Sequence, residues 1–138
     1  MLLDNVKKYY DKKYDYNCAE TILYAANEEY NLNLDKNALK TMAAFGGGMA
    51  IESICGAVTG SLAVLGIMFT KERAHESDRM KQLSQEFFEK FQDKLNTSNC
   101  KELKEKYRND DIRCSSILYA AAEVLEDIIV REKENNMV

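Results

Sequence analysis

Apolar residues recur every three or four positions along most of the chain, which is the spacing of one face of an α-helix. The last long segment shows this best, with Ile117, Leu118, Ala121, Val124, Leu125 and Ile128 on one face. The spacing and the turn residues between segments predict helices over 5–13, 17–30, 35–45, 49–70, 77–95, 100–107 and 113–132. The chain has no proline, which also favours long helices, and no segment predicts a strand. We therefore expect an all-α fold of about six to seven helices.

One stretch, residues 53–70, carries no charged side chain and is the most apolar part of the chain. A helix that is apolar on all sides is normally surrounded by other elements. A membrane span needs about 20 predominantly apolar residues, and this stretch is shorter, contains three glycines and has no partner span. We expect a compact helical bundle around this central apolar helix, with no membrane span.

The chain has 138 residues, the length of one domain, and no linker or change in composition divides it. Residues 1–138 are therefore expected to form a single helical domain. Its charged and polar end, residues 133–138, is expected to be a mobile, solvated tail. The triple glycine at 46–48 is expected to end the third helix, because glycine readily adopts the left-handed conformation of a helix cap.

The charge pattern excludes nucleic acid as a partner. The formal net charge is -4, and Lys and Arg are scattered among Asp and Glu, so no basic stripe exists for phosphates. The first residues are polar and lack the apolar core of a signal peptide, which predicts a cytoplasmic location. The single histidine, His75, lies in a charged segment, so no Ser–His or Cys–His arrangement supports a hydrolase.

Four cysteines, Cys18, Cys55, Cys100 and Cys114, are the candidate site residues. Thiols in the cytoplasm are usually reduced, so four of them indicate reactive thiols or metal ligands, unless they are simply small buried side chains. No CxxC motif is present. Cys18 follows Asn17, a helix cap with Glu20 three residues later, and the positive end of the helix dipole favours a thiolate there. Cys114 precedes the last helix and is expected to share this effect.

Cys55 begins the sequence CGAVTG, in which Gly56 and Gly60 share one helical face. Each glycine destabilises a helix by about 1 kcal/mol relative to alanine, so the presence of two glycines on one face indicates a specific role for them. One role is close packing of another helix. The other is room beside the Cys55 sulfur for a second thiol, a substrate or a cofactor, which makes Gly56 and Gly60 candidate cofactor-binding residues.

The residues leave several chemistries open. Cys18 and Cys55 are the expected working pair. Cys100 and Cys114, which flank the short helix and its turn and are expected to be exposed there, are their partners. Electrons would then pass by thiol–disulfide exchange, in a thiol-based oxidoreductase or electron carrier. Alternatively, all four cysteines converge on zinc or an iron–sulfur cluster. A third interpretation is a non-catalytic interaction module that forms a homodimer through the glycine face.

Four single cysteines spread over about 140 residues, with Cys55-Gly56-Ala57-Val58-Thr59-Gly60 at the second, resemble the C_GCAxxG_C_C family of redox-active proteins. The glycine-rich lead-in at 45–49 supports the resemblance, which covers nearly the whole chain. It implies a redox role for the four cysteines and a functional link to a transporter. The redox partner is unknown from the sequence.

Overall fold

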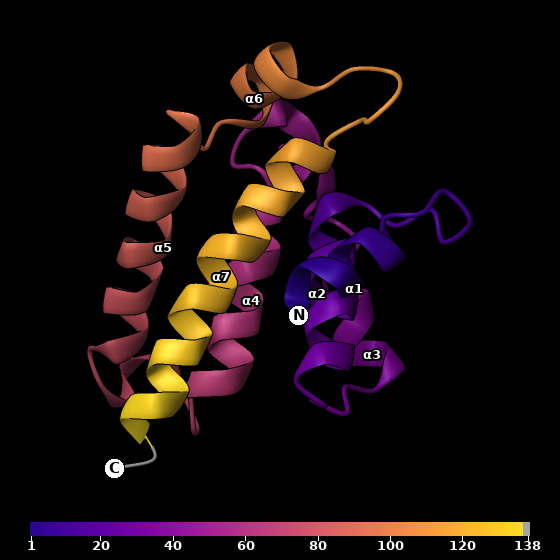
Figure 1. Cartoon of the computed structure of the whole chain (residues 1–138). Helices are drawn as coiled ribbons and strands as arrows, with labels where there is room; N and C mark the ends of the chain where they lie inside the picture. Colours follow the sequence, from indigo (N-terminus) through magenta and orange to yellow (C-terminus); the bar gives the residue numbers. More distant parts are fainter. Residues whose placement is uncertain (137–138) are drawn as a thin grey trace.

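The computed structural model of the chain describes residues 1–136 and consists of α-helices joined by loops (Figure 1). The helices are α1 (Leu2–Tyr9), α2 (Cys18–Glu29), α3 (Lys36–Lys40), α4 (Gly56–Phe69), α5 (Arg79–Leu95), α6 (Cys100–Tyr107) and α7 (Ser115–Asn136). Two short helical turns, η1 (Gly48–Glu52) and η2 (Ala74–Glu76), lie in the loops. The described residues form isolated bridges but no β-strand, so the predicted all-α fold is confirmed.

Helix α4 is the central element of the bundle. It packs against α2, α5 and α7, and Figure 1 shows α7 in front of it, with α5 on one side and α1, α2 and α3 on the other. Ala57, Val58, Val64 and Leu65 of α4 have no exposed surface. This confirms the prediction that an uncharged helix forms the core. No helix in residues 1–136 is long and apolar enough to span a membrane.

The two helices α2 and α4 run in the same direction and lie unusually close together. A Cβ atom added to Gly56 would lie 3.1 Å from the backbone nitrogen of Ala19, and one added to Gly60 would lie 2.7 Å from the carbonyl oxygen of Ala19. The missing side chains of both glycines therefore let the backbone of α2 approach. Close helix packing, one of the two roles expected for this glycine pair, is what the backbone geometry shows.

The observed α4 begins at Gly56, seven residues later than expected. The preceding loop has a left-handed backbone at Gly47, Gly48, Met49, Ala50 and Glu52, which no right-handed helix can accommodate. Two backbone hydrogen bonds then fasten this loop to the start of α6. The N–H of Cys55 donates to the carbonyl of Ser98 at 2.9 Å, and the N–H of Cys100 donates to the carbonyl of Ser53 at 2.5 Å. The start of α4 is thus fixed by a long-range contact.

Other helix ends also differ from the expected ones. The first helix occupies residues 2–9 because Leu2 and Val6 are its buried residues, and the chain then forms the loop 10–17. The third helix ends at Lys40 and is continued only by turns. The last helix continues to Asn136, into the segment 133–138 expected as a tail, and residues 137–138 lie outside the described part.

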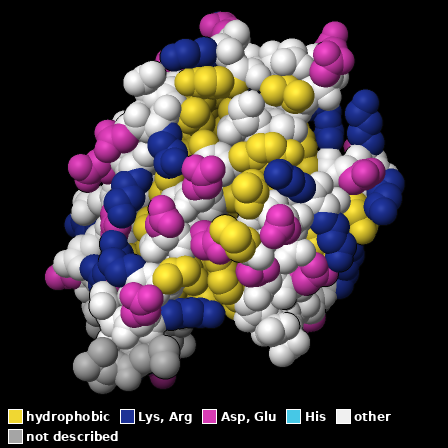
Figure 2. All heavy atoms as spheres, in the orientation of Figure 1, with side chains coloured by type: hydrophobic (Ala, Val, Ile, Leu, Met, Phe, Trp, Pro, Cys, Tyr) yellow, Lys and Arg dark blue, Asp and Glu magenta, His cyan; other side chains and the backbone are white. Residues whose placement is uncertain are grey.

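The surface shown in Figure 2 carries both signs of charge. Basic and acidic side chains are interspersed on this face, and hydrophobic side chains are exposed in patches between them. Ile51, in the loop before α4, is one of the large apolar residues at the surface and is 76% exposed. This face has no stripe of a single charge.

The contact between α2 and α4 gives a first prediction. Gly60→Ala should lower the free energy of unfolding by about 1–3 kcal/mol, because the new methyl group would overlap the backbone of Ala19. Gly66→Ala is the matched control in the same helix, since an added Cβ there meets nothing within 4 Å. That substitution should raise stability, by up to about 1 kcal/mol. Urea denaturation of both variants tests this, and equal effects would contradict the close approach.

Candidate functional site

Each of the four cysteines stands at the start of a helix. Cys18 and Cys100 are the first residues of α2 and α6, and Cys55 is the N-cap of α4. Cys114 directly precedes α7, and its carbonyl accepts a hydrogen bond from the N–H of Leu118 at 3.0 Å, as in a first helical turn. The expected positions of Cys18 and Cys114 at helix starts are therefore confirmed.

All four cysteines line one cavity of about 200 Å³. The four helices that begin at these cysteines therefore direct their N-terminal ends toward a shared space, and the end of a helix carries a partial positive charge. The cavity wall is completed by Tyr10, Tyr16, Asn17, Gly47, Gly56, Leu103, Lys104, Arg108, Arg113 and Ile117. Residues far apart in the sequence thus form one thiol-lined site.

The cap of α2 also anchors the glycine-rich loop beside the cavity. The side chain of Asn17 accepts a hydrogen bond from the N–H of Glu20 at 2.7 Å, and the Glu20 carboxylate accepts from the N–H of Asn17 at 2.9 Å. This is the capping box that the sequence predicts. The Asn17 amide also donates to the carbonyl of Ala43 at 3.1 Å, which ties the cap to the segment before the glycines.

Gly48 gives this loop its place against the third cysteine. Its backbone has φ +62, and an added Cβ would lie 2.7 Å from the Cβ of Cys100. A larger residue at this position would be strained in the left-handed backbone conformation, and its side chain would overlap the Cys100 side chain. The glycine run therefore lets the loop pack closely against Cys100. The sequence predicted only that these glycines end a helix, and this packing role was not foreseen.

Cys114 is the thiol whose surroundings favour a thiolate. Nη1 of Arg108 donates a hydrogen bond to Sγ of Cys114 at 3.2 Å, and the Cys18 thiol lines the same cavity. Hydrogen bonding by the Cys18 thiol and by Arg108, helped by the charges of Arg108 and Lys104, outweighs burial and lowers the pKa of Cys114 to about 6. At neutral pH the sulfur of Cys114 is therefore mostly ionised.

Cys18 takes the opposite role from the one expected. Its hydrogen bond to Cys114 holds its proton in place, and burial adds to this effect, so the pKa of Cys18 is raised well above that of an ordinary thiol. The expectation that the helix start makes Cys18 the thiolate is therefore wrong, because a neighbouring sulfur with a guanidinium partner holds the negative charge.

Cys55 and Cys100 remain neutral thiols. Burial raises the pKa of Cys55 to about 11 and also raises the pKa of Cys100. Cys100 and Cys114 are each only 5% exposed, so the expectation that they are exposed beside the short helix is wrong. Both cysteines are buried because α6 and α7 begin at the cavity wall.

Several residues that the sequence did not single out shape this site. The N–H of Cys114 donates to the Tyr10 hydroxyl at 3.2 Å, and the guanidinium of Arg113 lies 3.9 Å from the centre of the Tyr10 ring. Arg113 also donates to the carbonyl of Tyr10. These contacts fasten the end of α1 to the segment before α7. No local motif around Tyr10 or Arg108 announces such roles.

The four-cysteine set does not have the arrangement of a metal site. In residues 1–136, no group of three or more Cys, His, Asp or Glu side chains could hold a metal ion. The part of the chain described here contains free cysteines, with no disulfide between them. The geometry therefore gives no support to the alternative of a zinc or iron–sulfur centre.

The two glycines of the CGAVTG motif lie at different distances from the cavity. Gly56 belongs to its wall, and the position of its missing side chain is 3.3 Å from the Cβ of Cys18. Gly60 lies one turn further along α4, against Ala19 and Ile22. The glycine face is thus covered by α2 of the same chain.

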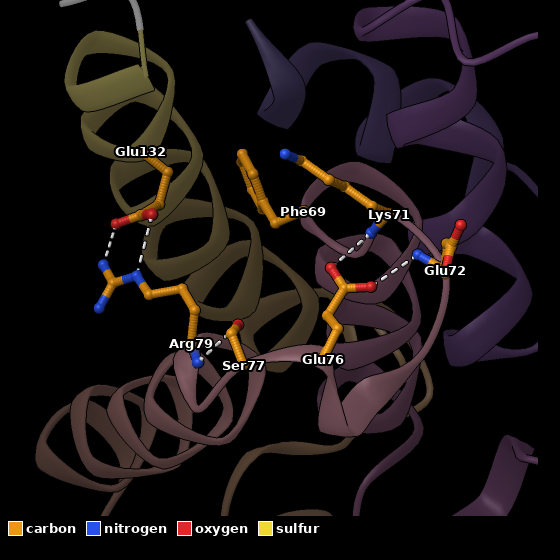
Figure 3. Close-up of a pocket in the computed structure, with 7 residues that line it drawn as sticks. All are labelled: Phe69, Lys71, Glu72, Glu76, Ser77, Arg79 and Glu132. Atoms are coloured by element: carbon orange, nitrogen blue, oxygen red, sulfur yellow. Dashed lines mark hydrogen bonds and ion pairs between the residues drawn. The ribbon is translucent and has the colours of Figure 1, made fainter.

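A larger hollow lies at the other end of α7, as Figure 3 shows. Arg79 pairs with Glu132, and Glu76 accepts hydrogen bonds from the backbone N–H groups of Lys71 and Glu72 at 2.9 and 2.6 Å. These contacts stabilise the packing of α5 on α7 and the loop before α5. The hollow is lined by no cysteine.

The comparisons with known proteins agree with the cysteine pattern. The sequence model of one family, described as "Putative redox-active protein (C_GCAxxG_C_C)", matches residues 16–128, which include all four cysteines. Comparison with curated proteins and with solved structures finds no match. The family match extends over most of the sequence, from the loop before α2 into α7. The chain therefore belongs to the C_GCAxxG_C_C family of redox-active proteins.

Proposed function

We propose that the protein carries out thiol–disulfide exchange, with Cys114 as the attacking thiolate and Cys18 as the thiol that completes the disulfide. The observation that supports this most strongly is the position of the Cys114 sulfur between the Arg108 guanidinium, at 3.2 Å, and the Cys18 thiol. A thiolate is the nucleophile in this exchange, and a thiol with a pKa near the ambient pH attacks best.

The exchange proceeds in two displacements. The Cys114 thiolate attacks one sulfur of an oxidised substrate disulfide, and the substrate's S–S bond breaks, so one half leaves as a thiolate with the bonding electron pair. Cys18 then loses its proton and attacks the Cys114 sulfur, which displaces the second half as a thiolate. The protein dithiol becomes a Cys18–Cys114 disulfide, and the substrate is reduced by two electrons to two thiols.

Cys55 and Cys100 form a second pair of thiols in this proposal. Burial is the main cause of the raised pKa of Cys100; the charge of Lys104 opposes it, and the negative charge on Cys114 adds to it. When Cys114 enters a disulfide its charge is lost, so Cys100 loses its proton more easily than before. Attack by Cys100 on Cys114, followed by Cys55 on Cys100, would move the disulfide to Cys55–Cys100 and regenerate the first pair.

A cytoplasmic location belongs to the same proposal. The four cysteines are free, and glutathione or thioredoxin systems in a reducing compartment keep thiols in that form. Such a compartment would also supply the reductant that returns the oxidised pairs to thiols.

The environment of Cys114 predicts the pH dependence of its alkylation. Its rate with iodoacetamide should follow a titration with a midpoint near pH 6 and fall at lower pH, because protonation removes the thiolate. Cys55 should stay slow at neutral pH, because its pKa is about 11. Peptide mapping by mass spectrometry after short reaction times would follow each site.

Arg108→Gln should raise the midpoint for Cys114 by about one pH unit or more, because the thiolate loses a charged hydrogen-bond donor. The matched control is Lys101→Gln, which removes an exposed positive charge from α6, the helix that Arg108 follows, but not from the cavity wall. An unchanged midpoint in the Arg108 variant would refute the role given to the guanidinium.

Mild oxidation predicts a specific disulfide. Treatment with diamide should remove two free thiols in a first step, form Cys18–Cys114 and be reversed by dithiothreitol, because the two cysteines line one cavity and each strongly affects the pKa of the other. Cys18→Ser should abolish this disulfide yet leave Cys114 reactive toward iodoacetamide, since the serine hydroxyl can still donate to its sulfur. Thiol titration and non-reducing peptide mapping would measure both.

Cys55→Ser is the control, because it should leave the Cys18–Cys114 disulfide in place. Four thiols that stay unchanged under diamide, or a first disulfide without Cys114, would overturn the proposed function.

A further inference from the structure

The wall of the cysteine cavity differs in charge from the protein as a whole. The chain has 23 acidic and 19 basic residues and a formal net charge of -4. The cavity wall contains three basic residues, Lys104, Arg108 and Arg113, and no aspartate or glutamate. Four helix starts also direct partial positive charge at the same space. The single negative charge of the Cys114 thiolate does not neutralise the three basic side chains and the four helix starts.

The three basic side chains have different partners. Arg108 binds the Cys114 sulfur, and Arg113 lies over the Tyr10 ring. Lys104 has only a loose ion pair, with Nζ 3.9 Å from the carboxylate of Glu52, and the Lys104 side chain is 34% exposed. Its ammonium group is therefore available to a ligand that enters beside the thiols.

The size of the cavity restricts what can reach Cys114. About 200 Å³ is less than the roughly 300–1,000 Å³ of pockets that hold drug-sized ligands. The Cys114 side chain is only 5% exposed, so a disulfide on the rigid surface of another protein could not reach its sulfur without a rearrangement. A small molecule is the better fit.

We propose that the cavity selects low-molecular-weight disulfides that carry carboxylate groups, with Lys104 attracting the carboxylate while Cys114 attacks the disulfide. This inference rests on the proposed thiol–disulfide exchange and names the substrate class for it. Lys104 acts as a specificity residue, since it neither forms nor breaks a bond. The substrate is reduced to two carboxylate-bearing thiols, and the protein is oxidised to the Cys18–Cys114 disulfide.

The atoms balance in this reaction. Cys114 forms a bond to one substrate sulfur as the substrate's own S–S bond breaks, and the first carboxylate-bearing thiolate leaves with the electron pair. Cys18 releases its proton and displaces the second thiolate from Cys114. Negative charge that develops on each leaving sulfur is stabilised by the same basic residues that line the wall.

Two symmetrical disulfides that differ in charge test the selection. Dithiodiglycolate carries two carboxylates, and bis(2-hydroxyethyl) disulfide carries none. The oxidation rate of the reduced protein would be measured with each at pH 7 and low salt, and the ratio divided by that for an unstructured cysteine peptide. We expect a normalised ratio of about ten in favour of dithiodiglycolate, falling as salt is added.

Variants at one position of the wall sharpen the test. Lys104→Gln should lower the normalised ratio about threefold or more, and Lys104→Glu should lower it further. Both variants also raise the pKa of Cys114, but this change slows the reaction with both disulfides alike and so cancels in the ratio. Lys101→Gln, on the same helix but outside the wall, should leave the ratio unchanged.

The outcomes separate this inference from the proposed function. Oxidation by both disulfides with a normalised ratio near one, or a ratio that Lys104→Glu does not change, overturns the selection and leaves thiol–disulfide exchange standing. If neither disulfide oxidises the protein and diamide also forms no Cys18–Cys114 disulfide, both proposals are lost.

Discussion

The close approach of α2 and α4 is the constraint on which the cysteine cavity depends. Gly56 and Gly60 lack the side chains that would keep the two backbones apart, so Cys18 and the CGAVTG motif lie side by side at the starts of parallel helices. Helix α5 then returns the chain to this end of the bundle, where Cys100 begins α6 and Cys114 precedes α7. Without the glycine contact, the four helix starts would not enclose one space.

Because the four thiols share a small buried space, electrostatic interactions between them give them different pKa values. Several thiolates together would repel one another in a medium of low dielectric, so the negative charge belongs to the sulfur with the strongest donors. The Cys18 thiol and the Arg108 guanidinium favour that charge at Cys114, and the remaining thiols keep their protons, with the pKa of Cys55 at about 11. One thiolate beside several neutral thiols is the arrangement from which we propose thiol–disulfide exchange.

The same arrangement connects the family match with the chemistry. The family is described as redox-active and is named for its cysteine pattern. In this chain all four cysteines line one cavity. The bridge between Ile54 and Asn99, with its two backbone hydrogen bonds, fixes the second and third cysteines relative to each other. These hydrogen bonds hold the starts of α4 and α6 together at the cavity wall.

The sequence by itself determined the helical class, the uncharged central helix and the cap that places Cys18 at a helix start, because local spacing and capping chemistry specify these features. It also identified the four cysteines and the glycine pair. Only the tertiary structure decided which cysteine is ionised. Arg108 and Cys18 come close to Cys114 only through tertiary packing at the cavity, and local spacing along the chain carries no information about such contacts.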